Sequence, residues 1–175
     1  YDLQQAIIDE LREGLSSAYR HLRELLTTFR LKIDEAGLKG AIEQTVSQLQ
    51  TRSEMDITLH YQLANVPLSP SEEIHLLQII REASQNAVSH SQGSQLNIAL
   101  TQEADTIQLT LQDNGIGLGE HPEKLNHYGL AIMQERSRHL NAELHLKSVL
   151  DGIQGTRIEL RFRPEYLCRD TSEPA

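Results

Sequence analysis

The chain has 175 residues, of which 38% are hydrophobic and 23% are charged, and its formal net charge is −9. This length and composition fit one main globular domain, and the acidic balance argues against direct nucleic-acid binding, which needs clustered Lys and Arg side chains. No apolar run approaches the roughly 20 residues of a membrane span, and the single cysteine, Cys168, leaves no partner for an internal disulfide, so we expect a soluble chain in a reducing compartment.

The first 33 residues predict a helix with a heptad seam, because apolar or small residues recur at alternating steps of three and four. The seam consists of Ile8, Leu11, Leu15, Ala18, Leu22, Leu25 and Phe29. So narrow a stripe needs partner helices, although packing on the helix's own domain remains an alternative. The stretch 34–37 breaks the pattern, and we place a domain boundary after residue 36. Because the sequence begins directly in this pattern, we expect a piece of a longer protein.

The next part of the chain predicts two helices and three strands. A helix is expected at 39–53, and the strict alternation from Ile57 to Leu63 predicts a half-buried strand. Ser69-Pro70-Ser71-Glu72 combines an N-cap Ser, a first-turn Pro and an N3 Glu, so a helix begins here and runs to about His90. Alternating apolar residues then predict an antiparallel hairpin. Its strands are centred on 96–100 and 107–111, and its polar turn is 102–105.

The C-terminal part of the chain is expected to close the sheet. Residues 117–128 predict a mobile loop, and a helix is expected from Gly129 to Leu140. Two strands follow at about 143–149 and 156–163, which completes a domain at 37–164. The residues after Pro164 are polar, and we expect a frayed tail at 165–175.

Three polar residues recur every four positions on the predicted helix at 70–90. Glu82, Asn86 and His90 should therefore share a face. The amide oxygen of Asn86 suits Mg²⁺, and Glu82 could hold a metal-bound water or orient an attacking group. Taken alone, the spacing fits a solvated helix face better. The core side of this helix is expected to hold Ile80, Ala83 and Ala87.

Asp113-Asn114-Gly115-Ile116-Gly117 follows the second hairpin strand. A carboxylate can accept a hydrogen bond from the exocyclic amine of adenine, and the two glycines would let the backbone approach the ring. Asn-Gly is also the commonest hairpin signal. No strand pattern resumes for about 25 residues after Gly117, however, which argues against a simple two-residue hairpin.

Two further glycine motifs are weak when each is taken alone. Gly129-Leu130 would place the free N–H groups of a helix start beside phosphate, but it also fits an ordinary helix start. Gly155-Thr156-Arg157 resembles a strand entry, and the Thr156 hydroxyl could bond adenine or a bridging water. His121 and His127 match no zinc spacing, and no Gly-x-Ser-x-Gly elbow of a hydrolase occurs.

The order of these motifs resembles that of the GHKL ATPases over residues 40–164. The N box of that superfamily resembles Glu82-x-x-x-Asn86, and the G1 box resembles Asp113-x-Gly115-x-Gly117. The G2 box resembles Gly129-Leu130, and the final glycine box resembles Gly155-Thr156. Ile80-Arg81-Glu82-Ala83, Met133-Gln134-Glu135-Arg136 and Gly155-Thr156-Arg157 look like histidine kinases that signal to NarL-type response regulators. Residues 25–31 and His127-Tyr128-Gly129-Leu130 look like the nitrate/nitrite sensor kinases.

This resemblance implies an α/β (α+β) two-layer sandwich of the Bergerat type, with a mixed, mostly antiparallel sheet and helices on one face. ATP would bind between helices under a lid at 117–128, Asn86 would hold Mg²⁺, and Glu82 would assist phosphoryl transfer. Asp113 would bind adenine. The implied cofactor-binding residues are Asn86, His90, Asp113, Gly115, Gly117, His127, Tyr128, Gly129, Leu130, Gly155 and Thr156.

The resemblance also suggests what lies around this domain. The helix at 2–33 looks like the last part of a dimerisation and phosphotransfer hairpin, and the phosphoacceptor His would sit on a preceding helix. His21 is the one histidine on the predicted bundle helix, and no acidic residue follows it directly. We therefore expect a fragment that binds ATP without labelling itself. It would belong to the cytoplasmic part of a homodimeric inner-membrane sensor, attached to the membrane only through absent upstream segments.

Three departures from the family pattern affect details of the pocket. Ser89 replaces a frequent Lys or Arg, Asn126 replaces a usual glycine, and Asn141-Ala142 replaces a common glycine pair. Two other functions remain open. One is a GHKL ATPase that hydrolyses ATP, which the heptad helix disfavours, and the other is a non-catalytic nucleotide-binding dimerisation module, which the intact Glu82 and Asn86 disfavour.

Overall fold

The computed structural model describes residues 2–33, 37–63, 68–118, 127–148 and 154–169. Its centre is a five-stranded mixed sheet with the strand order β1-β2-β3-β5-β4. The strands are β1 (Asp56–Gln62), β2 (Gln95–Glu103), β3 (Thr106–Asp113), β4 (Glu143–Ser148) and β5 (Thr156–Phe162). β1 runs parallel to β2, and the other neighbouring strands are antiparallel.

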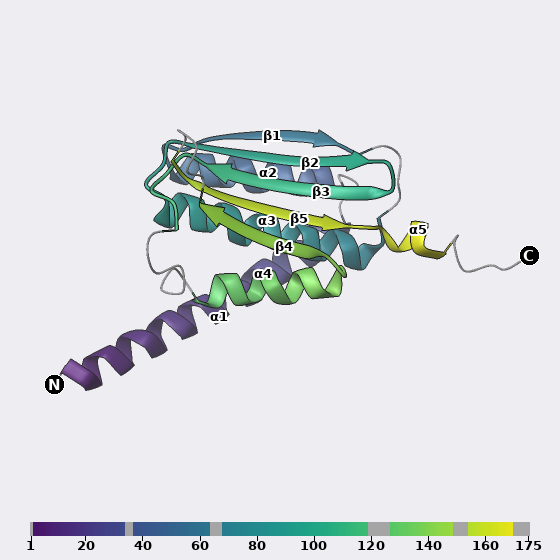
Figure 1. Cartoon of the computed structure of the whole chain (residues 1–175). Coiled ribbons are helices and arrows are strands. Elements are labelled where there is room, and N and C mark those ends of the chain that lie inside the picture. Colours follow the sequence, from purple (N-terminus) through teal and green to yellow (C-terminus); the bar gives the residue numbers. More distant parts are fainter. Residues whose placement is uncertain (1, 34–36, 64–67, 119–126, 149–153, 170–175) are drawn as a thin grey trace, which may run out of the picture.

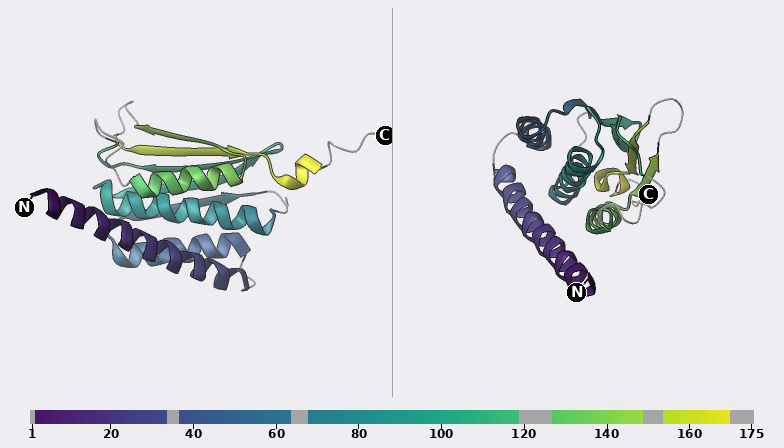
Figure 2. Two further views of the ribbon diagram at one scale, coloured as in Figure 1. Left: turned by 90° about the horizontal axis from the view of Figure 1, so that it is seen from below. Right: turned by 90° about the vertical axis from the view of Figure 1, so that its left-hand side faces the viewer.

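The described residues also form five helices. They are α1 (Asp2–Ile33), α2 (Gly37–Arg52), α3 (Pro70–His90), α4 (His127–His139) and α5 (Glu165–Arg169). Figure 1 shows α2, α3 and α4 on the same side of the sheet, and the right-hand view of Figure 2 places α1 outside this helical layer, away from the sheet. The two-layer α/β sandwich with a mostly antiparallel sheet is thus confirmed.

The predicted capping box forms at the start of α3. The Ser69 hydroxyl accepts a hydrogen bond from the backbone N–H of Glu72 at 3.2 Å, and the Glu72 carboxylate accepts one from the backbone N–H of Ser69 at 2.7 Å. The second carboxylate oxygen of Glu72 accepts a bond from the N–H of Glu165 at 2.7 Å. One buried side chain therefore joins the start of α3 to the start of α5.

Several helical boundaries differ from the expectation. α2 begins at Gly37, two residues before the predicted start at residue 39. α4 begins at His127, two residues before the predicted start at Gly129. The expectation of a frayed segment directly after Pro164 is wrong for residues 165–169, which form α5, because Glu72 anchors the first N–H of that helix. The rest of the predicted tail and most of the predicted lid, at 170–175 and 119–126, lie outside the described residues.

Strand alternation places a carboxylate on the inner face of the sheet. In β3, Ile107, Leu109 and Leu111 are buried, and Asp113 takes the next inward position with 6% of its surface exposed. Inward residues of a strand recur every second position, so the pattern that builds the core also carries Asp113 beneath the helices. The core is aliphatic, as the composition suggested, and its largest fully buried members include Ile42, Leu76, Ile79, Ile80, Leu96, Ile98, Leu100 and Leu160.

The turn from α4 into β4 accommodates one of the departures from the family pattern. Asn141 has a φ of 50°, which lies in the left-handed region. Asparagine enters this region more readily than most residues other than glycine. Asn141 can therefore replace a glycine in this turn.

α1 forms a continuous helix, but most of the large apolar side chains described along it are exposed to solvent. They are Ile7, Ile8, Leu11, Leu15, Tyr19 and Leu22, with exposed fractions from 50% to 75%. Partner helices for this surface remain a prediction. Within the described ranges, no helix combines the length and hydropathy that crossing a membrane would require.

Candidate functional site

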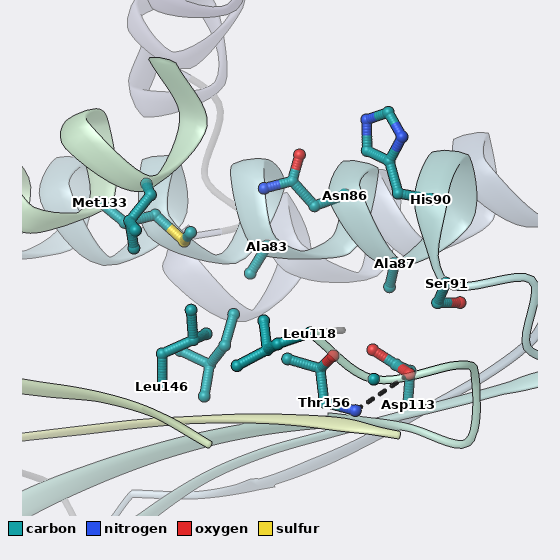
Figure 3. A pocket seen from close by; sticks show the side chains of 13 residues that line it. Ala83, Asn86, Ala87, His90, Ser91, Asp113, Leu118, Met133, Leu146 and Thr156 are labelled. Atoms are coloured by element: carbon teal, nitrogen blue, oxygen red, sulfur yellow. Dashed lines mark hydrogen bonds between the residues drawn. The ribbon is translucent and has the colours of Figure 1, made fainter. Parts of the chain in front are cut away.

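A cavity of about 590 Å³, open mouth included, lies between α3, α4 and the sheet (Figure 3). Its walls combine seven apolar side chains with a few polar ones, as is common for small-molecule sites. The lining residues are Ala83, Asn86, Ala87, His90, Ser91, Asp113, Gly117, Leu118, Leu130, Met133, Leu146, Thr156 and Ile158. Six of the residues singled out from the sequence are among them: Asn86, His90, Asp113, Gly117, Leu130 and Thr156.

The Asp113 carboxylate is held in a defined orientation at the floor of the cavity. Its Oδ1 accepts hydrogen bonds from the backbone N–H of Gly115 at 2.8 Å and of Thr156 at 3.2 Å. Figure 3 shows the other oxygen pointing into the cavity, beneath Ala87 and Ser91. Because both backbone donors bind one oxygen, the second oxygen is presented to a ligand as an acceptor.

The motif after Asp113 is packed against the end of α3. A Cβ at Gly115 would overlap the carbonyl oxygen of Ser91, which itself accepts a hydrogen bond from the N–H of Ile116 at 2.8 Å. The sequence predicted that Gly115 lacks a Cβ so that a ligand can approach. The structure gives a different reason, since the protein's own backbone takes that space.

Asn114 and Gly155 complete the frame around Asp113. The Asn114 side-chain oxygen accepts hydrogen bonds from the N–H groups of Ser94 and Gln95, both at 2.9 Å, which ties the start of β2 to the end of β3. Gly155 has a φ of 147°, and a Cβ there would overlap the carbonyl oxygen of Asp113. Only glycine fits both this backbone conformation and this approach, so Gly155 shapes the site without lining the cavity.

The face of α3 that lines the cavity is not the face predicted. Each step of four residues rotates by about 40° beyond a full turn, so Glu82 and His90 are separated by about 80°. The lining face is centred on Ala83, Asn86, Ala87 and His90, and Figure 3 shows the two alanines pointing toward the sheet. Ala83 and Ala87 are buried, as predicted for the core side of this helix, and they also line the cavity.

Glu82 lies outside this lining and faces α1. Its side chain is 1% exposed, and its Oε2 lies 2.9 Å from Nε2 of His21. The three residues predicted to share one face are thus divided. Asn86 and His90 border the cavity, while Glu82 pairs with a histidine 61 positions earlier in the chain.

The predicted residues around the start of α4 are placed only in part. Tyr128 is 47% exposed, and neither it nor Gly129 is among the lining residues, whereas Leu130 is. The side chain of His127 lies outside the described residues. Within the described ranges, no group of three or more His, Cys, Asp or Glu side chains could hold a metal ion. Asn86, the residue predicted to hold Mg²⁺, is among the lining residues of the cavity.

Several lining residues are not among the binding residues predicted from the sequence. They are Ser91, Leu118, Met133, Leu146 and Ile158, together with the two alanines of α3. The alternation in β4 and β5 marks Leu146 and Ile158 as inward residues. Nothing in that pattern distinguishes a residue beneath a cavity from one beneath packed side chains, so their role depends on how the helices are placed.

The arrangement suits a flat heterocycle with an amine on its edge. Apolar side chains from α3, α4 and the sheet can cover both faces of a ring, and the free oxygen of Asp113 can accept a hydrogen bond from its amine. Asn86 and His90 lie at another edge of the same cavity. Adenine has this combination of a flat apolar surface and an exocyclic amine, so the residues present fit an adenine nucleotide.

Comparisons with known proteins agree with this geometry. Residues 71–166 match the family model described as histidine kinase-, DNA gyrase B- and HSP90-like ATPase. The chain is 40% identical over 156 residues to a NarQ sensor homolog of Haemophilus influenzae, covering 89% of this chain. It is 37% identical over 164 residues to the nitrate/nitrite sensor NarX of Escherichia coli, covering 94%. It spans 27% of the length of each of these two relatives.

Solved structures with low sequence identity share the fold. A blue-light activated histidine kinase of Erythrobacter litoralis has a TM-score of 0.71 at 18% identity, with 89% of this chain and 51% of that chain covered. The ATP-binding domain of PrrB from Mycobacterium tuberculosis has a TM-score of 0.58 at 16% identity, with 71% and 91% covered. Together with the matched family model, the fold and the cavity show that the chain belongs to the histidine kinase-, DNA gyrase B- and HSP90-like ATPase family.

Proposed function

We propose that this chain is the ATP-binding catalytic region of a sensor histidine kinase and that it transfers the γ-phosphoryl group of ATP to a histidine outside this sequence. Residues 37–164 would form the catalytic domain, and residues 1–36 would be the second helix of the dimerisation and phosphotransfer hairpin. The observation that carries the proposal is the buried Asp113 carboxylate, which presents one oxygen to an apolar cavity.

Each residue of the site has a defined task in this proposal. Asp113 accepts a hydrogen bond from the adenine amine, and Ala83, Ala87 and Leu130 cover the ring. Asn86 and His90, at the other edge, hold the phosphate end, and Asn86 provides an oxygen ligand for Mg²⁺. Bound Mg-ATP supplies the transferable phosphoryl group together with a cation that neutralises phosphate charge.

A broader biological role is supported by the relatives that the chain resembles. We propose that the full protein is a homodimer whose catalytic region lies in the cytoplasm and that it signals to a NarL-type response regulator. Nitrate or nitrite would be the signal, as the names of the similar sensors suggest. Attachment to the inner membrane would come from segments outside this sequence.

Replacement of Asp113 by Asn tests the nucleotide site. The amide side chain of the Asp113→Asn variant can still accept the two backbone hydrogen bonds with its oxygen, but it presents a donor to the adenine amine instead of an acceptor. Losing one buried hydrogen bond and leaving a donor unpaired costs about 1.5 to 3 kcal/mol, which corresponds to roughly 10- to 150-fold weaker binding. Calorimetric titration with ADP and a non-hydrolysable ATP analogue, with and without Mg²⁺, measures the change.

Asp105→Asn is the matched control, because it removes the same charge at the exposed turn before β3. We expect this control to bind ADP like the wild-type chain. Equal affinities for all three proteins would contradict the assignment of the adenine site to Asp113.

Phosphotransfer to a separately supplied acceptor hairpin distinguishes the kinase from its two alternatives. Labelling of the hairpin by γ-labelled ATP supports the kinase. Hydrolysis without labelling would instead support an ATPase, and neither activity would support a non-catalytic module. In the kinase, Glu82→Gln should reduce transfer by about 10²- to 10⁴-fold, the usual contribution of a residue that handles a proton. Its ADP affinity should not change, because Glu82 does not line the cavity.

A further inference from the structure

α1 has two faces of different chemistry. On one face, the described apolar side chains Leu11, Leu15 and Leu22 are more than half exposed. Three small or polar residues, Gly14, Ser17 and His21, recur at steps of three and four and form a second stripe, which we call the polar stripe. Ser17 is 7% exposed and His21 is partly buried, so this stripe faces the rest of the protein in the described part of α1.

The first contact of the polar stripe is made by His21 with the buried carboxylate of Glu82. Nε2 of His21 lies 2.9 Å from Oε2 of Glu82, and Nδ1 of His21 lies 3.4 Å from the Ser17 hydroxyl. The Ser17 contact orients the ring. The other oxygen of Glu82, Oε1, is buried and has no hydrogen-bond partner among the described residues. With α1 in place, one oxygen of Glu82 is therefore bonded to His21 and the other is covered.

The second contact lies about two helical turns earlier in α1. A Cβ added to Gly14 would lie 3.2 Å from the hydroxyl oxygen of Tyr128. Tyr128 is the second residue of α4 and lies two positions before the cavity-lining Leu130. The polar stripe thus contacts α3 through His21 and α4 through Gly14, the two helices between which the cavity opens.

The two faces of α1 do not compete for the same side chains. The exposed apolar face remains available for other helices while the polar stripe contacts α3 and α4. α1 can therefore contact residues 37–169 through the polar stripe while its apolar face packs against other helices. The His21–Glu82 contact is also limited to one hydrogen-bonded pair with a partly exposed imidazole, so it can break and re-form.

We propose that the polar stripe of α1 is a docking surface for residues 37–169 and that docking withholds Glu82 from the phosphoacceptor. This inference rests on the proposed kinase function. A phosphoacceptor imidazole needs an accessible oxygen of Glu82, and the docked helix leaves none. Release of α1 from α3 and α4 is therefore a required step before phosphotransfer, and His21 is a positioning residue that controls it.

Distance measurements test the docking without any need for kinase activity. Nitroxide labels are attached at Glu10→Cys on α1 and Gln134→Cys on α4, two exposed positions, in a chain whose native thiol is removed by Cys168→Ser. Pulsed electron paramagnetic resonance then measures the distance between the two labels. A narrow distance distribution is expected. His21→Ala should broaden it by removing the bond to Glu82, and Gly14→Leu should broaden it independently by displacing Tyr128. Glu13→Ala, at an exposed position on the same helix, is the control and should leave it narrow.

Phosphotransfer by the unlabelled variants then tests the consequence of docking. His21→Ala and Gly14→Leu should each raise the rate of transfer to a supplied acceptor hairpin several-fold, with an unchanged affinity for ADP. Distances that stay narrow in both variants would overturn the docking surface. Broad distances with slower transfer would overturn the inhibitory role, because His21 would then assist the reaction. Variants that undock but show no transfer in any protein would overturn the kinase function and leave the docking surface supported.

Discussion

At the scale of single residues, the site depends on one carboxylate whose orientation is set by backbone groups. Asp113 receives hydrogen bonds from the N–H groups of Gly115, which follows β3, and Thr156, which begins β5. The position of Gly115 in turn depends on close contact with the backbone of Ser91. A change at Gly115 should therefore affect both the stability of the fold and the direction of the Asp113 carboxylate.

Replacement of Gly115 by Ala tests this dependence. The added methyl group would overlap the Ser91 carbonyl group, so we expect a loss of about 1 to 3 kcal/mol in the free energy of unfolding, as for an overpacked core position. ADP affinity should fall as well, because the N–H that orients Asp113 moves. Urea unfolding and calorimetry measure the two effects.

Gly37→Ala is a control for the stability effect alone. Gly37 has a φ of 62° and open space around the position of a Cβ, so this change should cost about 1 to 2 kcal/mol through backbone strain. Its ADP affinity should remain that of the wild type. Equal ADP affinities for the Gly115→Ala variant and the wild type would contradict the role of Gly115 in orienting Asp113.

At the scale of elements, α3 is the helix on which the rest of the molecule depends. Its first turn holds α5 through Glu72, and its middle carries Glu82 and Asn86. Its C-cap residue, Ser91, contacts the Asp113 motif. The capping box defines the start of α3, because the backbone N–H groups of Ser69 and Glu72 each donate a hydrogen bond to the other residue's side chain. Errors in the register of α3 would displace every part of the site.

Replacement of Glu72 by Gln tests the junction between α3 and α5. The amide has one acceptor oxygen where the carboxylate has two, so the N–H of either Ser69 or Glu165 loses its partner. We expect a loss of about 1 to 3 kcal/mol in the free energy of unfolding. Glu73→Gln removes the same charge from the same turn and should cost less. A Glu72→Gln variant as stable as the Glu73→Gln variant would show that the junction contributes little.

At the scale of the whole molecule, the cavity exists because α3 and α4 pack side by side against one face of the sheet. A pair of histidines marks this packing. The rings of His75 on α3 and His139 on α4 are stacked with their centroids 4.7 Å apart and their planes 5° from parallel. Burial lowers the pKa of His75, and the neighbouring His139 and Arg136 lower it further, against a smaller opposite effect of Glu135.

This lowered pKa predicts how stability depends on pH. The unfolded chain binds a proton at His75 more readily than the folded chain does, so the stabilisation is fully present above the ordinary histidine pKa and is lost as the pH falls below it. We expect the free energy of unfolding to decrease between about pH 7 and pH 5, with a smaller slope for His75→Gln. Urea unfolding across this pH range provides the measurement.

His145→Gln is the control for the pH dependence, because His145 is exposed on β4, where it lies 3.7 Å from Glu143. This variant should keep the slope of the wild-type chain. A slope that is the same for the His75→Gln variant and the wild type would exclude the stacked pair as its source.

Local sequence signals were sufficient for much of the fold. Residues 69–72 specify the start of α3, and the alternation from Ile107 to Leu111 specifies β3 and extends to the buried Asp113. These features are encoded by neighbours within a few positions, through capping and through the two-residue period of a strand. The motif order also led to the correct family, because the spacing of the polar and glycine residues reflects the whole site.

The sequence by itself therefore determined the strands, the helices before α5, their order along the chain and the carboxylate at the centre of the site. The tertiary structure decided which face of α3 lines the cavity, because a four-residue repeat drifts by about 40° per step and cannot place Glu82 and His90 together. It also decided that Gly115 contacts Ser91, that Glu72 anchors α5 and that Glu82 meets His21. Each of these contacts joins residues between 24 and 93 positions apart, and no local pattern of side chains carries information over that separation.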